Sequence, residues 1–317
     1  MLPMTCRIFS LVLITACALA QTAAGPMTAL NFVPSGDLPG FTIAKTVNEV
    51  NLIFTVTDTK NRLSPALGAS DFRLLDNHHA PAALRYFQHQ SELPLRVGLL
   101  IDNSSSITER FKYEKKAAGE FLKRMLRPGI DQAFVVAFDD DVHLMHDFSS
   151  DVPALQTSIS RMRPGGNTSL YDALIYAAKK LHKSDESTVT RRVIILISDG
   201  VDTKSKAIMH DVQEAAVRAD AVVFCLSTND LHVEYPRGEA VLELVSGPTG
   251  GYILPAREEA HLKKAFTQLE KILRNQYALG YTPSDFTADG TFHSVDIIPV
   301  KSGLRVRCRK GYFAEKK

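Results

Sequence analysis

The sequence lacks several features that would point directly to a class of function. Its 37 basic and 35 acidic side chains nearly cancel, and the positive residues are scattered along the chain. Because a net charge of +2 creates no strong field, neither nucleic acid nor an anionic membrane surface is an expected partner. Apolar runs long enough to cross a bilayer as a helix are also absent, so no transmembrane segment is expected.

Sequence motifs of several enzyme classes are missing as well. The phosphate-binding patterns G-x-x-x-x-G-K-[ST] and G-x-G-x-x-G do not occur, and no serine stands in a G-x-S-x-G turn. The four cysteines and ten histidines show no spacing typical of a zinc site. With no evident nucleophile or general base, the chain is not expected to be an enzyme.

The amino-terminus has the features of an export signal. Arg7 precedes the apolar run at residues 8–14, and Ala18-Leu19-Ala20 is a cleavage site of the A-x-A type. Cleavage there gives a mature chain that begins at Gln21. The alternative is a lipid anchor at Cys17, because residues 14–17 resemble a lipobox. In either case the protein is expected to be exported, to the periplasm or beyond.

Two of the four cysteines remain in the predicted mature chain. These are Cys225 and Cys308, and both lie in strand-like segments. Export would permit a disulfide. Because the two residues fall in different predicted domains, we expect two unpaired thiols.

Hydrophobic patterns divide the chain into several regions. The residues around 50–58, 72–77 and 83–87 are rich in β-branched and aromatic residues and predict strands, as do three segments near the carboxyl terminus. Each group is too small to bury a core alone, so we expect the two groups to form one β-sandwich. The predicted regions are a signal peptide at 1–20, a leader at 21–40, an N-terminal β segment at 41–92, an α/β domain at 93–275 and a C-terminal β segment at 276–317.

The central region alternates strands with helices, which predicts an α/β fold with a doubly wound, mostly parallel sheet. Residues 133–138 and 142–148 form two strands separated by only three residues. A connection that short requires an antiparallel pair, and we place it at the edge of the sheet.

Oxygen-bearing side chains follow two buried strands of this region. Asp102, Ser104 and Ser106 come directly after the apolar run at residues 95–101, and Asp199 follows the run at 192–197. Thr168 lies in a glycine-rich loop before a helix. Ligands of open α/β sheets collect at the carboxyl ends of the strands, and a hard divalent cation prefers oxygen ligands. The set therefore predicts a site for Mg²⁺ or Mn²⁺.

Other polar residues near these loops have simpler explanations. Asp139-Asp140-Asp141 is expected to be a solvated hairpin turn, with a second metal contact as the alternative. Asp172 is expected to stabilise the positive end of its helix. Thr168 or Ser169 is expected to cap that helix.

The order Asp-x-Ser-x-Ser, then Thr, then Asp resembles the metal-ion-dependent adhesion site of von Willebrand factor type A domains. The resemblance implies that Ser104, Ser106 and Thr168 contact Mg²⁺ directly or through water, and that Asp102 and Asp199 bind mostly through water. One coordination position would stay open for a partner's carboxylate. Segments at 50–76, 93–95, 127–129, 275–281 and 309–313 further resemble a family of exported acidobacterial proteins related to these domains.

These features predict an exported, metal-dependent protein-binding module that captures an Asp or Glu of a partner protein. The competing hypothesis is an Mg²⁺-dependent hydrolase, or an accessory subunit of an envelope enzyme complex. A third hypothesis is a purely structural envelope protein, in which loss of Asp102 would leave partner binding unchanged.

Overall fold

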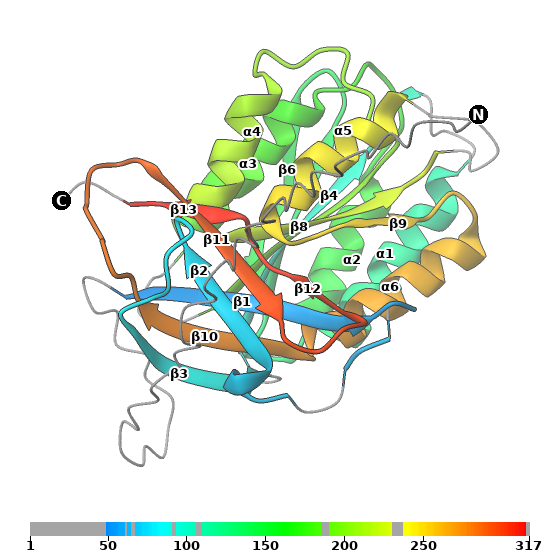
Figure 1. The fold of residues 1–317 in the computed structure, drawn as a ribbon. Coiled ribbons are helices and arrows are strands. Elements are labelled where there is room, and N and C mark those ends of the chain that lie inside the picture. Colours follow the sequence, from blue (N-terminus) through cyan, green and yellow to red (C-terminus); the bar gives the residue numbers. More distant parts are fainter. Residues whose placement is uncertain are drawn as a thin grey trace, which may run out of the picture.

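The computed structural model describes residues 49–60, 62–64, 67–90, 93–105, 110–184, 190–229 and 237–314 (Figure 1). The predicted signal peptide and leader, with Cys17, lie outside these ranges, and so does Ser106. Among the described helices, none combines the length and apolar character needed to span a bilayer.

A six-stranded sheet forms the centre of the larger domain, in the order β6-β5-β4-β7-β8-β9. The sheet is parallel except for the edge strand β6, which pairs antiparallel with β5. This arrangement confirms the predicted mostly parallel sheet with one antiparallel edge. The strands are β4 (Leu95–Asp102), β5 (Gln132–Phe138), β6 (Val142–Ser149), β7 (Arg191–Ser198), β8 (Ala221–Ser227) and β9 (Ile253–Pro255).

Helices cover both faces of this sheet, as its almost continuously apolar strands require. One apolar core contains residues of α1, α2 and α6, and the other contains residues of α3, α4 and α5. The first group is α1 (Phe111–Met125), α2 (Val152–Arg161) and α6 (Glu259–Leu273). The second is α3 (Leu170–His182), α4 (Met209–Arg218) and α5 (Arg237–Ser246), and short 3₁₀ turns occur at η1 (Ala69–Asp71) and η3 (Gly247–Thr249).

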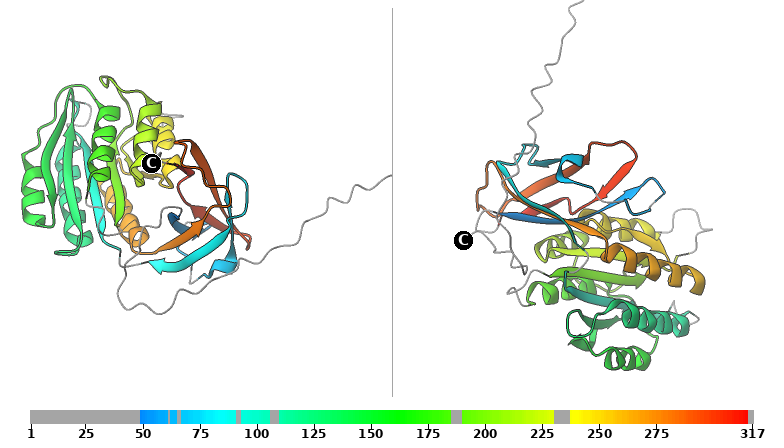
Figure 2. Two further views of the ribbon diagram at one scale, coloured as in Figure 1. Left: turned by 90° about the vertical axis from the view of Figure 1, so that its left-hand side faces the viewer. Right: turned by 90° about the horizontal axis from the view of Figure 1, so that it is seen from below.

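The two ends of the described chain form a β-sandwich beside this domain (Figure 2). One sheet has the order β12-β1-β10-β3 and the other has the order β13-β11-β2, so each contains strands from both ends. The predicted shared sandwich is thus confirmed, whereas the exact domain boundaries stay predictions. Its strands are β1 (Val50–Asp58), β2 (Phe72–Asp76), β3 (Ala83–Gln90), β10 (Gln276–Thr282), β11 (Phe292–Pro299), β12 (Leu304–Arg307) and β13 (Gly311–Phe313).

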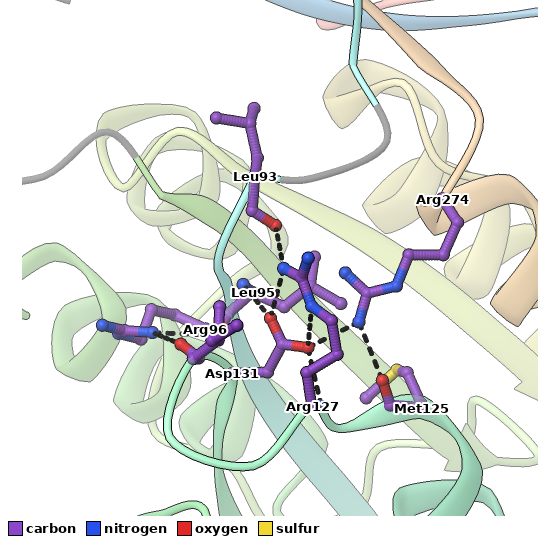
Figure 3. Close-up of polar contacts among 8 residues, drawn as sticks. Leu93, Leu95, Arg96, Met125, Arg127, Asp131 and Arg274 are labelled. Atoms are coloured by element: carbon purple, nitrogen blue, oxygen red, sulfur yellow. Dashed lines mark hydrogen bonds and ion pairs between the residues drawn. The ribbon is translucent and has the colours of Figure 1, made fainter. Parts of the chain in front are cut away.

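A buried carboxylate joins the two places where the chain passes between the domains (Figure 3). Asp131 accepts hydrogen bonds from the Leu95 backbone at 2.8 Å, from Arg127 Nη2 at 3.0 Å and from Arg274 Nη2 at 2.5 Å. Burial acts to raise the pKa of Asp131, but the bonds from Arg127 and Leu95 outweigh it and hold the pKa below its usual range. Leu95 begins β4 and Arg274 follows α6, so Asp131 fixes both crossings.

The two cysteines that the structure describes are unpaired, as expected. Cys225 is buried in β8, and Cys308 is half-buried in the sandwich after β12. Burial raises the pKa of the Cys308 thiol to about 11, which keeps this thiol protonated at neutral pH.

Candidate metal site

The first predicted ligand lies where β4 ends. Asp102 is 1% exposed; its Oδ1 accepts a hydrogen bond from the Ser104 backbone at 3.0 Å, and its Oδ2 accepts one from Ser198 Oγ at 2.8 Å. Burial raises the pKa of Asp102 to about 6, and the charge of Asp199 adds to the rise, although the bonds from Ser104 and Ser198 oppose it. A nearby cation would stabilise the negative charge of this buried carboxylate.

The glycine-rich loop before α3 is bonded directly to the loop after Asp102. The Ser105 N–H donates to the Gly166 carbonyl at 3.2 Å, and the Gly165 N–H donates to the Asn103 carbonyl at 2.7 Å. These bonds bring Thr168 to the same edge of the sheet. Thr168 is 7% exposed, and its hydroxyl makes no hydrogen bond to any residue that the structure describes. The hydroxyl is therefore available to a ligand.

The third loop begins at Asp199, directly after β7. Asp199 Oδ1 accepts a hydrogen bond from the Val201 backbone at 3.0 Å. Gly200 has φ +78°, and a Cβ atom on Gly238 would lie 1.8 Å from the Asp199 carbonyl oxygen. Glycine is therefore required on both sides of this contact, and the close approach of α5 fixes the direction in which the Asp199 corner leaves the sheet.

The acidic hairpin turn supports these loops from the side. Asp139 accepts hydrogen bonds from Asn103 Nδ2 and from His143 Nε2, both at 3.0 Å, and Asp140 Oδ1 accepts one from Asn167 Nδ2 at 2.7 Å. Burial acts to raise the pKa of Asp139, but the bonds from the Asp141 backbone, His143 and Asn103 prevail and lower it. The aspartates hold neighbouring loops, which favours the structural explanation over a second metal contact.

The prediction that a side chain of Thr168 or Ser169 caps α3 is wrong. Ser169 occupies the N-cap position but makes no capping hydrogen bond with its side chain, and its Oγ donates instead to the Asp140 carbonyl at 2.8 Å. Ser205 Oγ accepts from the Tyr171 and Asp172 backbones at 3.0 and 3.2 Å. The free N–H groups of the helix are thus satisfied by a distant loop, because the local hydroxyl already serves the acidic turn.

Asp172 connects the same distant loop to α3. Its Oδ2 and Oδ1 accept hydrogen bonds from the Lys206 and Ala207 backbones, both at 3.1 Å. The Thr168 carbonyl accepts from the Thr203 and Lys204 backbones at 3.0 and 3.1 Å. The segment that follows Asp199 and the segment that contains Thr168 therefore form one hydrogen-bonded unit.

Four of the five predicted ligands, Asp102, Ser104, Thr168 and Asp199, lie on three adjoining loops at the carboxyl edge of the sheet, and Ser106 lies outside the described residues. Within the described ranges no three His, Cys, Asp or Glu side chains lie together so that they could hold a metal. A cation at this edge would thus depend on hydroxyl groups and water as well as on the two aspartates. The donors are all oxygens, and the buried Asn103 Oδ1 has no hydrogen-bond partner among the described residues. This set fits a hard divalent cation.

Sequence patterns missed two residues at this edge. Ser198 orients Asp102, and the signal for it was its position as the last residue of a strand beside Asp199. Glu114 is a buried acid on α1, and the signal for it was a carboxylate on the apolar stripe of a predicted helix.

The groove between α3 and α4 lies apart from this constellation. Its lining includes Tyr176, Lys179, His182, Lys206 and Arg218, and it contains none of the predicted metal ligands. Asp172 lines it as well, but both oxygens of that carboxylate bind the neighbouring loop. The groove therefore adds no group to the metal site.

Comparison with known proteins agrees with this architecture. Residues 97–201 match the family model of the von Willebrand factor type A domain. This segment contains all five predicted ligands, and the protein therefore carries a von Willebrand factor type A domain. The narrower likeness to exported acidobacterial proteins rests on the sequence segments alone. No curated protein matches the chain.

Several solved structures are similar to parts of this chain at low sequence identity. The PilB minor pilin from Streptococcus sanguinis is 15% identical, with a TM-score of 0.47 over 58% of this chain and 62% of that one. This chain thus spans less than two thirds of PilB. The von Willebrand factor domain of the type V pili tip protein Mfa5 from Porphyromonas gingivalis is 15% identical, with a TM-score of 0.47 over 56% and 94%. A von Willebrand factor type A protein from Catenulispora acidiphila is 13% identical, with a TM-score of 0.49 over 78% and 74%.

Proposed function

We propose that the protein is an exported binding module that captures a partner protein through a divalent cation. The cation, Mg²⁺ or Mn²⁺, would be held by Asp102, Ser104, Ser106, Thr168 and Asp199. The observation that carries the proposal is the meeting of three loops at one sheet edge, where a buried Asp102 with a raised pKa lies beside Asp199. A cation there would offset the repulsion between the two aspartates.

The partner's contribution would be the carboxylate of an Asp or Glu. Two protein carboxylates and neutral hydroxyls leave coordination positions that water fills until a stronger ligand arrives. Attraction between a cation and a carboxylate is strong where surrounding protein limits the access of water. Contacts around the rim would then set which partner binds.

Binding would move two segments together. The Thr203 and Lys204 backbones donate to the carbonyl of Thr168, so a shift of Thr168 toward a cation pulls on the loop after Asp199. A partner that changes the coordination of the cation would therefore be sensed by both segments.

The enzyme alternative requires a base that can reach a substrate. Glu114 is the strongest candidate by its pKa, which burial raises to about 7, but its side chain is only 1% exposed. A substrate at the rim of the loops could not reach this carboxylate directly. We therefore propose binding without turnover.

Affinity capture from an envelope extract tests the proposal. Immobilised wild-type protein should retain a partner in Mg²⁺ and release it in EDTA, whereas Asp102→Ala should retain none. A matched pair of variants sharpens the test. Ser104→Ala and Ser105→Ala each delete one serine hydroxyl, at neighbouring positions. Only Ser104 stands in the ligand pattern, while Ser105 Oγ donates to the Gly166 carbonyl. Equal capture by all variants, with or without EDTA, would contradict metal-dependent binding.

A further inference from the structure

Glu114 is a charged side chain placed on the apolar face of α1. Its neighbours on this face include Phe111, Ala118 and Phe121, all of which are buried. Glu114 itself is fully buried. Helical periodicity alone would put an apolar residue at this position, and burial of an acid costs free energy unless a partner compensates it.

Compensation within the described protein is incomplete. Neither carboxylate oxygen of Glu114 has a hydrogen-bond partner among the described residues. Its ion pair among the described residues joins Oε1 to Arg110 Nε at 3.8 Å, and Arg110 Nη1 donates to the Thr228 carbonyl at 2.6 Å. Burial above all raises the pKa of Glu114; Arg110 opposes the rise, and the charges of Asp102 and Asp199 add to it.

A short series of contacts connects Glu114 to Asp102 in the candidate metal site. Arg110, its ion-pair partner, donates to the Thr228 carbonyl. The Thr228 N–H donates to the Ser198 carbonyl at 3.1 Å, and Ser198 Oγ donates to Asp102. Glu114 is therefore linked to the corner that carries the two predicted aspartate ligands, and the charges of both aspartates act on it.

Further buried oxygens without a hydrogen-bond partner belong to residues of this series or next to it in the sequence. Besides the two oxygens of Glu114, Thr228 Oγ1 and Asn103 Oδ1 are buried without a hydrogen-bond partner among the described residues. The Glu114 carboxylate and Asn103 Oδ1 can only accept hydrogen bonds, whereas the Thr228 hydroxyl can also donate one. Buried polar groups in native proteins are paired almost without exception, so the Glu114 carboxylate is expected to have a partner outside the described residues, such as water.

We infer that Glu114 is a further acid of the cation site, which accepts hydrogen bonds from water in the hydration shell of the cation. The inference rests on the proposed function and extends it beyond the five-residue ligand pattern. Contact through water agrees with the absence of a three-acid metal group among the described residues. Glu114 is thus a positioning residue, and its charge raises the affinity of the site for a divalent cation.

The test is calorimetric titration of Mn²⁺ into the mature protein and its variants. Glu114→Gln keeps the volume of the side chain and removes its charge. Loss of an outer partner of a metal site typically weakens affinity by about 10–100-fold, and we expect a loss in that range. Asp76→Asn is the matched control, because Asp76 is another buried acid but lies in the β-sandwich, and it should leave the affinity unchanged.

A second variant separates this role from a purely structural ion pair. Arg110→Met removes the positive partner and leaves the carboxylate in place. If Glu114 acts on the cation, Arg110→Met should bind Mn²⁺ more tightly than wild type, opposite to Glu114→Gln. If Glu114 only pairs with Arg110, both variants should lower the unfolding midpoint alike and neither should change the affinity specifically. That result would overturn the inference, and the Arg110 variant decides the question even if Glu114→Gln does not fold.

The same titration distinguishes the two levels of the argument. Binding by wild type, none by Asp102→Ala and undiminished binding by Glu114→Gln would overturn the role of Glu114 and leave the proposed function standing. No binding by wild type would overturn both.

Discussion

The two ends of the central sheet treat buried carboxylates in opposite ways. At the amino end, Asp131 receives hydrogen bonds from Leu95, Arg127 and Arg274, which together lower its pKa. At the carboxyl end, Asp102 is buried to a similar degree, yet its pKa is raised to about 6. The difference lies in the supply of donors: positively charged groups meet Asp131, whereas Asp102 has two neutral donors and a neighbouring negative charge.

This contrast separates a structural site from a site for a ligand. The Asp131 carboxylate is complete, in the sense that the protein itself supplies its hydrogen-bond donors and no other molecule is needed. Asp131 also fixes the places where the chain crosses between domains (Figure 3). Asp76 in the β-sandwich is complete too, because the hydroxyls of Tyr281 and Tyr312 donate to it at 2.5 and 2.9 Å. The incomplete acids collect at the carboxyl edge, which is where ligands bind in sheets of this type.

The largest expected effect is on stability, at the amino end. Asp131→Ala leaves Arg127 and Arg274 without their partner, and breaking a buried ion pair in this way costs about 3–5 kcal/mol. Urea denaturation should show that loss in the free energy of unfolding, while Mn²⁺ affinity stays at the wild-type value. A variant that is as stable as wild type would remove the distinction between the two ends.

Ser198→Ala should have a smaller effect on stability, at the carboxyl end. The variant removes the hydroxyl that donates to Asp102 and accepts from the Gly200 backbone. A hydrogen bond to a charged group contributes roughly 1.5–3 kcal/mol. Denaturation should show a loss of that size in the absence of cation, and calorimetry should show weaker Mn²⁺ binding as well. Unchanged affinity would mean that Asp102 does not need Ser198 for its orientation.

Thr168→Ala should weaken the binding of the cation without lowering the stability of the fold. The described hydrogen bonds of Thr168 use its backbone, so loss of the hydroxyl breaks none of them. We expect Mn²⁺ affinity to fall by roughly 10–100-fold, as for other residues that support a metal, and the unfolding midpoint without cation to stay constant. Thr203→Val is the control that tests the loop contact, because Thr203 Oγ1 accepts from the Thr168 backbone.

The pH dependence should be the smallest of the four effects. Burial raises the pKa of Asp102 to about 6 and that of Glu114 to about 7, so the native state holds protons that the unfolded chain releases near pH 4. Without cation, the stability that these groups contribute is therefore greatest at low pH and declines as the pH rises toward about 7.

A cation competes with the same protons, so its affinity should change in the opposite direction. We expect Mn²⁺ to bind roughly tenfold more tightly at about pH 7.5 than at about pH 5, with release of protons. Calorimetry in buffers of different ionisation enthalpy measures both quantities. An affinity that is independent of pH would show that neither acid is near the cation.

Much of the architecture followed from local sequence patterns. Apolar runs that end in Asp-x-Ser-x-Ser and Ser-Asp-Gly identified two parallel strands and placed Asp102 and Asp199 at the same edge. The three-residue gap before Val142 required the antiparallel edge strand. The shared β-sandwich followed from the inability of either chain end to bury a core alone.

The remaining details depend on contacts between distant segments, which local patterns do not contain. Ser169 was expected to cap α3, but Asp140 takes its hydroxyl and Ser205 provides the cap. The surroundings of Glu114 could not be predicted, because periodicity shows which face of a helix is buried and not which residues that face contacts. The role of Ser106 stays a prediction, because this residue lies outside the described ranges.

The most direct test is to locate the cation itself. Crystals grown with MnCl₂ should show one anomalous peak at the carboxyl edge of the sheet, within coordination distance of the hydroxyl oxygens of Ser104 and Thr168. Water should connect the same ion to Asp102, Asp199 and Glu114. A well-ordered site without an anomalous peak, or a manganese ion bound only elsewhere, would contradict the account.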